Sequence, residues 1–274
     1  MTALPLPDLM LLLAALAAAG LVGGLIAGLF GVGGGTVIVP AVFYAFEALG
    51  VGGEGNLHTA IGTSLLTIVA TAWRSLKAHR AHGAVDETVL KTWTPWVGAG
   101  ALIGAAVAGV TSMAGLAIVY GVCLLVVAAQ LGLAPERWVL RPDLPTGWGR
   151  RATGTLIGGL SAMMGIGGGS FGGMMMTLCG RPIHQAVATA SGFGLAIGAA
   201  ATLGFVVFGW DAGGRPPLSL GYVNVPGAVV MALLTTAVAP WGAKLAHALD
   251  RRVLRRAFAV YLLIAAAAVV GKAL

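Results

Sequence analysis

The chain carries one glycine-rich hexapeptide twice, at matched places in two apolar halves. Gly31-Val-Gly-Gly-Gly-Thr36 returns as Gly165-Ile-Gly-Gly-Gly-Ser170, each time after one apolar run and before another. Consecutive glycines carry no Cβ, so they allow a tight turn and a close approach of the backbone to a ligand. A helix that begins there directs free amides and the positive end of its dipole toward an anion. The repeat predicts a duplicated membrane unit with an equivalent helix start in each half.

The composition indicates a polytopic membrane protein. Hydrophobic residues make up 58% of the 274 residues and charged residues 9%, whereas about a quarter of a soluble domain is charged. The apolar runs recur along the whole chain, and no basic residue precedes the first run, so a cleaved signal peptide is not expected. The basic residues behind the net charge of +7 lie in short loops between these runs. We assign them to membrane orientation and expect no nucleic-acid partner.

Ten apolar segments divide into two groups of five. They cover roughly 9–29, 36–49, 58–76, 92–110, 115–132, 152–164, 170–180, 184–208, 222–243 and 256–272. The polar stretch from 135 to 151 separates the groups. We therefore expect an all-α protein of two membrane repeats, residues 1–135 and 136–274, that form one transport domain. The second and seventh segments are shorter than the roughly 20 residues that cross a bilayer. This predicts short or re-entrant helices and eight to ten membrane segments in total.

The basic residues orient the segments. If the loop after the third segment is cytoplasmic, then all of the 16 Lys and Arg residues except Arg215 and Lys272 lie inside. The positive-inside rule therefore predicts that the N-terminus of this multi-pass protein lies outside. We expect the membrane to be a bacterial inner membrane. Five segments per half is an odd number, so the second half enters the membrane from the opposite face. The repeat is accordingly expected to be inverted.

Backbone amides and hydroxyls from both halves form the candidate substrate site. Its residues are Gly33, Gly34, Gly35, Thr36, His58, Thr63 and Ser64 in the first half, and Gly167, Gly168, Gly169, Ser170, His184, Thr189 and Ser191 in the second. Thr36 and Ser170 occupy the expected N-cap positions. An anion would satisfy amides that are costly to leave unpaired in a membrane. Alternatively, the glycines only permit close helix packing, and the hydroxyls bond to the preceding helical turn.

Four ionisable residues have further candidate roles. His58-Thr-Ala-Ile-Gly-Thr63 and His184-Gln-Ala-Val-Ala-Thr189 open the third segment of each half, and each histidine can attract an anion, couple a proton or simply cap a helix. Glu47 is a carboxylate near membrane depth, and Arg181 is a cation at the inner mouth. Both are candidates for gating or coupling. The two cysteines lack metal-ligand spacing, so we expect no metal and no cofactor.

The motifs resemble those of the TauE/SafE family of sulfite and organosulfur-anion permeases. The resemblance rests on GVGGGTVIVP (31–40) followed by HTAIGTSL (58–65), and on GIGGGS (165–170) followed by HQAVATAS (184–191), and covers nearly the whole chain. It implies about eight spans in two repeated halves and movement of sulfite, sulfoacetate or related anions. Two details depart from the pattern. The expected Thr-Ser pair reads Thr189-Ala-Ser191, and no proline stands where the first half has Pro40.

These observations favour a permease, not an enzyme, that exports small sulfur-containing anions through a central site. A negative cell interior drives each expelled charge outward by about 2.3 kcal/mol per 100 mV, so export needs no coupling ion. Two alternatives stay open: an anion channel, and an intramembrane serine hydrolase in which Ser191 pairs with His58 or His247. The expected partners are a small sulfur oxyanion or sulfonate and the lipid bilayer. The sequence leaves the oligomeric state open.

Overall fold

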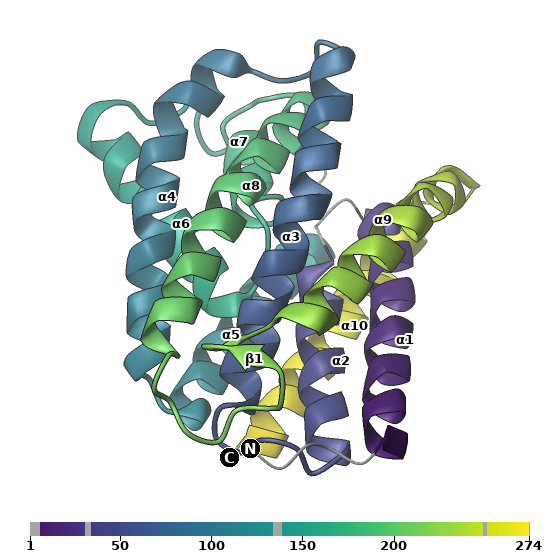
Figure 1. Cartoon of the computed structure of the whole chain (residues 1–274). Coiled ribbons are helices and arrows are strands. Elements are labelled where there is room, and N and C mark those ends of the chain that lie inside the picture. Colours follow the sequence, from purple (N-terminus) through teal and green to yellow (C-terminus); the bar gives the residue numbers. More distant parts are fainter. Residues whose placement is uncertain (1–5, 31–33, 134–138, 249–250, 274) are drawn as a thin grey trace.

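The computed structural model describes residues 6–30, 34–133, 139–248 and 251–273, and ten α-helices lie within these ranges (Figure 1). The first five are α1 (Leu6–Phe30), α2 (Gly35–Ala48), α3 (Asn56–Ala81), α4 (Glu87–Val110) and α5 (Met113–Leu133). The second five are α6 (Gly147–Met164), α7 (Phe171–Leu178), α8 (Ile183–Phe208), α9 (Val225–Ala248) and α10 (Arg251–Ala273). All ten segments expected from the sequence are confirmed as helices.

Six helices within the described ranges are long and apolar enough to cross a membrane: α1, α4, α5, α8, α9 and α10. The protein is therefore an all-α, multi-pass membrane protein. Helix α3 is equally long but carries polar side chains that are buried inside the molecule, among them Thr63, Ser64 and Thr67. Helices α2 and α7, with 14 and 8 residues, are shorter than a span, as their segment lengths predict.

The first helix of each half packs against the fourth helix of the other half. Helix α1 packs against α9, and α4 packs against α6 and α8. The third helices, α3 and α8, lie side by side, and so do the fifth helices, α5 and α10. Small residues bring the backbones together: a Cβ on Gly100 of α4 would overlap the Thr155 carbonyl of α6. Such close approach is typical of helices in membranes.

The connections gather at two ends of the molecule. One, which we call the strand end, comprises residues 49–56, 111–113 and 209–224; the last of these ranges carries the two-residue strands β1 (Ser219–Leu220) and β2 (Val223–Asn224). There the Gly55 amide donates to the Gly214 carbonyl at 3.2 Å. The other, the basic end, comprises residues 74–91, 139–151, 178–184 and 244–248. There the Leu140 amide donates to the Leu178 carbonyl at 2.8 Å. No sequence pattern predicted these two strands.

Candidate functional site

The two glycine-rich turns lie against each other. Helix α2 begins at Gly35, after its N-cap residue Gly34, and α6 ends at Met164, before its C-cap residue Gly165. A Cβ on Gly35 would overlap the Gly165 carbonyl oxygen, and that same oxygen accepts a hydrogen bond of 2.8 Å from the Ser64 hydroxyl. Gly33 and the two residues before it lie outside the described residues. The remaining part of the first turn, the second turn and α3 therefore meet at one place.

Within the second turn, the glycines serve different purposes. Gly165, with φ of +64°, ends α6: its amide donates to Ala162, and the next amide donates to Ser161. Gly168 serves packing, because a Cβ there would lie 2.6 Å from the Gly194 amide nitrogen of α8. At Gly167 the nearest side-chain atom would lie 3.4 Å away, which is ordinary contact, and Gly169 is half-buried.

The predicted N-caps are confirmed only in the second half. The N-cap residue of α2 is Gly34, so the expectation that Thr36 caps this helix is wrong. The helix begins two residues earlier, because glycine can occupy the cap position itself. Ser170 does hold the N-cap position of α7, but its side chain forms no capping hydrogen bond.

Thr36 has instead a distinctive backbone environment. Four residues later stands Pro40, which has no N–H to donate to the Thr36 carbonyl. The hydroxyls of Tyr261, from α10, and Tyr120, from α5, donate to this carbonyl at 3.2 and 3.5 Å. The fifth helices of both halves thus hold the first turn of α2. The sequence signal was the proline spacing, but nothing in the sequence identified its partners.

Thr63 and Thr189 make equivalent bonds across the halves. The Thr63 hydroxyl accepts from the amide of Asn224, which precedes α9, and the Thr189 hydroxyl accepts from the amide of Asp86, which caps α4. Both distances are 2.9 Å. The side chains of Asn224 and Asp86 each accept an amide hydrogen bond from one turn into their own helix. Each threonine therefore holds the fourth helix of the opposite half.

Ser191 bonds within its own helix. Its hydroxyl donates to the Ala188 carbonyl at 2.6 Å. This is the bond to the preceding helical turn that is the alternative to ligand binding. Ser191 lies in the third turn of α8 from the basic end, whereas His58 begins α3 at the strand end. The side chain of His247 lies outside the described part of the structure. Among the described residues, no hydrogen bond joins a histidine to this serine.

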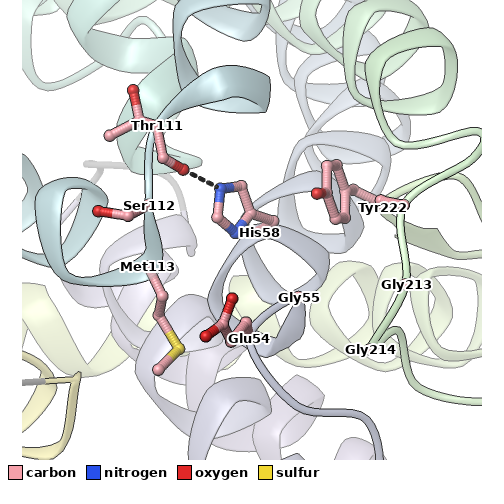
Figure 2. Close-up of a pocket in the computed structure, with 10 residues that line it drawn as sticks. Glu54, Gly55, His58, Thr111, Ser112, Met113, Gly213, Gly214 and Tyr222 are labelled. Atoms are coloured by element: carbon pink, nitrogen blue, oxygen red, sulfur yellow. Dashed lines mark hydrogen bonds between the residues drawn. The ribbon is translucent and has the colours of Figure 1, made fainter.

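The two histidines occupy opposite surroundings. His58 is 4% exposed and its Nε2 lies 2.9 Å from the Thr111 carbonyl oxygen and 3.0 Å from that of Ala108. It lines a cavity of about 410 Å³ at the strand end (Figure 2). His184 is exposed at the start of α8. His58 stands six residues before Ser64, or about 9 Å along the helix axis, so it does not touch the meeting turns.

The gating candidates lie at opposite ends. Glu47 accepts a hydrogen bond of 2.7 Å from Asn56, and its second oxygen lies 3.8 Å from the Lys272 ammonium. Arg181 follows α7 at the basic end, and its Nε is buried without a hydrogen-bond partner. Among the described residues, no three His, Cys, Asp or Glu side chains are grouped to hold a metal ion.

Together, the apolar spans define a multi-pass membrane protein, and a short helix at the matching place in each half is typical of transporters. A family model described as "Sulfite exporter TauE/SafE" matches residues 16–269, and the chain belongs to this family. The family resemblance stated from the motifs is thereby confirmed.

Curated relatives agree with this class. A "Probable membrane transporter protein" of Haemophilus influenzae is 30% identical over 247 residues, which cover 90% of this chain and 94% of the relative. "Probable membrane transporter protein YunE" of Bacillus subtilis is 28% identical over 62% of this chain and 69% of its own length. No solved structure matches the chain. The protein is a membrane transporter, and its family is not one of enzymes.

Proposed function

We propose that this transporter exports small sulfur-containing anions, sulfite or organosulfonates, through a central site where the two glycine-rich turns meet. One observation carries the proposal: Gly35, at the start of α2, lies against Gly165, which leads into α7. The first amides of a helix have no partner inside that helix, and the helix dipole is positive there. The start of α2, beside the turn that leads into α7, therefore suits a small oxyanion that accepts several hydrogen bonds.

Two inverted repeats, residues 1–135 and 136–274, are part of the proposal. The exchanged packing of α1 with α9 and of α6 with α4 supports them. The matched bonds of Thr63 and Thr189 to the opposite half support the same relation. The hairpin of α1 and α2 opens toward the strand end, and that of α6 and α7 toward the basic end (Figure 1). Alternating access then follows from rocking one repeat against the other.

The basic end is assigned to the cytoplasm of a bacterial inner membrane, with the strand end and the N-terminus outside. Arg181 then faces the anion at its entry. A negative interior drives each departing charge by about 2.3 kcal/mol per 100 mV, so export proceeds without a coupling ion. The hydroxyls of Thr63, Ser64, Thr189 and Ser191 bond to protein groups in this conformation. As ligands, the hydroxyls of Thr63, Ser64 and Thr189 exchange these partners for the anion during the transport cycle.

Efflux from vesicles tests the proposal. The purified protein is reconstituted into vesicles loaded with sulfite, thiosulfate, ethanesulfonate or sulfate, and a potential negative inside is imposed. We expect protein-dependent efflux that saturates, with competition between sulfite and the sulfonate, and slower movement of sulfate. Equal movement of all four anions, or of none, contradicts the proposal. Efflux that rises linearly with concentration identifies an anion channel instead, since a channel has no cycle to saturate.

A further inference from the structure

The cavity at the strand end lies apart from the meeting turns. Its walls come from three elements: Glu54 and His58 at the start of α3, Thr111 and Ser112 between α4 and α5, and Tyr222 of the strand hairpin. Figure 2 shows His58 between the Thr111 carbonyl and Tyr222, with Glu54 beyond its second ring nitrogen. The His58 and Tyr222 rings stack with their centroids 4.8 Å apart.

The hydrogen bonds fix the tautomer of His58. Nε2 faces two carbonyl oxygens, those of Thr111 and Ala108, and carbonyl oxygens only accept. Nε2 therefore carries the proton, and in the neutral ring Nδ1 is a bare acceptor. Nδ1 is buried and has no partner. A buried acceptor without a donor is unfavourable. Once Nδ1 binds a proton, it is no longer an unpaired acceptor.

Two opposing effects act on the charge of His58. Burial lowers the pKa of the His58 imidazole, and the backbone carbonyls of Thr111, Ala108 and Glu54 oppose this shift without cancelling it. The first two stand at the C-terminus of α4, the negative end of its dipole. The Glu54 carboxylate also lines the cavity. His58 thus differs from the helix starts at the turns, where the dipoles attract an anion.

The other charged groups near His58 are not hydrogen-bond partners of its Nδ1. The guanidinium of Arg215 donates to the Gly209 carbonyl at 2.7 Å, and Asp211 of the same loop is exposed. Burial raises the pKa of Tyr222 and Arg215 opposes this, so the phenol enters the cavity as a neutral group. The α4–α5 junction adds only the hydroxyls of Thr111 and Ser112. Glu47 and Lys272 pair with each other beyond Asn56.

We propose that Nδ1 of His58 binds a proton from the water of this cavity, and that the resulting imidazolium controls the release of the anion at the strand end. The proton passes from hydronium to Nδ1 and leaves water behind. The ring then donates from both nitrogens, through Nε2 to the end of α4 and through Nδ1 toward the Glu54 carbonyl. This control rests on the proposed anion export, because the charge acts on an anion that passes the cavity.

The repeat supplies a matched control. His184 occupies the corresponding place in the second half but is exposed, with no carbonyl cage among the described contacts. His58→Gln keeps an amide donor for the Thr111 and Ala108 carbonyls but binds no proton. His184→Gln makes the same chemical change outside the cavity. The two variants therefore separate protonation of His58 from general effects of losing a histidine.

Efflux measured at a series of external pH values tests whether protonation of His58 controls anion release. In the wild type we expect sulfonate efflux to change more than about twofold as the pH on the strand side crosses the titration of a histidine. His58→Gln makes efflux independent of that pH, and His184→Gln leaves the dependence unchanged. A dependence that survives in His58→Gln, or disappears in His184→Gln, overturns the proposal.

A second measurement is independent of transport. Mass spectrometry follows deuterium exchange at the imidazole C2 position of each histidine in the intact protein as the pH is varied. We expect a sigmoidal pH profile for His58, because only a ring that titrates gives one. A flat profile from about pH 4 to 8 overturns the proton site. If no anion moves in any assay, the proposed export fails and this profile still decides whether His58 binds a proton.

Discussion

The two halves share an order of motifs but differ in how their short helices are held. In the first half, Pro40 donates no hydrogen bond to the Thr36 carbonyl, which instead accepts from two tyrosine hydroxyls. These bonds join α2 to α5 and α10. In the second half, Met174 stands at the proline position, and α7 is only eight residues long. The backbone contacts of Thr63 and Thr189 are alike, whereas the histidines are not. The two halves therefore share backbone contacts, whereas their side chains at matched positions have different surroundings.

The largest effect is expected where the halves touch. Gly35→Ala places a methyl group on the Gly165 carbonyl, which should lower the free energy of unfolding by about 1–3 kcal/mol and abolish efflux. Gly167→Ala is the matched control, because its methyl group finds room. That variant should fold normally yet transport more slowly, since the methyl group narrows the proposed site. Thermal unfolding and vesicle efflux measure both. Normal efflux in both variants refutes the role of the turns.

The threonine bonds should differ in strength between the halves. Thr63→Val leaves the Asn224 amide unpaired at a residue that is 2% exposed, with an expected loss of about 1–3 kcal/mol. Thr189→Val leaves the Asp86 amide unpaired, but Asp86 is only half-buried and water can reach it. The free energy of unfolding should therefore fall by less than in Thr63→Val. Thermal unfolding compares the variants, and hydrogen exchange at the two amides locates the change. Equal losses would show that burial does not distinguish the two junctions.

A second substitution can test by rescue whether the tyrosine hydrogen bonds to the Thr36 carbonyl, which we call the tyrosine anchor, support transport. Tyr261→Phe removes the shorter hydroxyl bond to the Thr36 carbonyl and should cost about 1 kcal/mol while slowing efflux. Pro40→Ala restores a backbone N–H that reaches the same carbonyl. The double variant should therefore recover most of the efflux lost in Tyr261→Phe, as measured in vesicles. If the second substitution brings no recovery, the anchor does not act through this carbonyl.

The smallest effect is expected at Ser191. Its hydroxyl bonds to its own helix, so Ser191→Ala should change stability by less than about 0.5 kcal/mol and leave efflux nearly intact. The same variant tests the hydrolase alternative, since hydrolysis by this serine would disappear with the hydroxyl. Efflux and an esterase assay on one preparation measure both properties. A large loss of efflux would place Ser191 in the anion path.

Hydropathy and charge in the sequence predicted the ten helices, but not their polar ends. Helix α4 begins at Glu87, several residues before its apolar run, because the Asp86 side chain caps it. The strand pair at residues 219–224 escaped prediction because two-residue strands leave too short a pattern.

The glycine motif located the meeting turns, but adjacent glycines look alike in a sequence. Only packing distinguishes Gly168, closed in by α8, from Gly167, which has room. Likewise, the matched position of His58 and His184 suggested one role, whereas the cavity that distinguishes them depends on the hairpin around Tyr222, far along the chain. Long-range contacts of this kind have no local signature.

Protection of a cysteine at the junction tests the central claim most directly. Gly167→Cys is introduced after Cys123 and Cys179 are replaced by alanine, and a small maleimide labels the protein in membranes. If the meeting turns hold the anion, ethanesulfonate should slow this labelling in a saturable manner while chloride does not. Labelling at the same rate with and without the sulfonate would contradict the account.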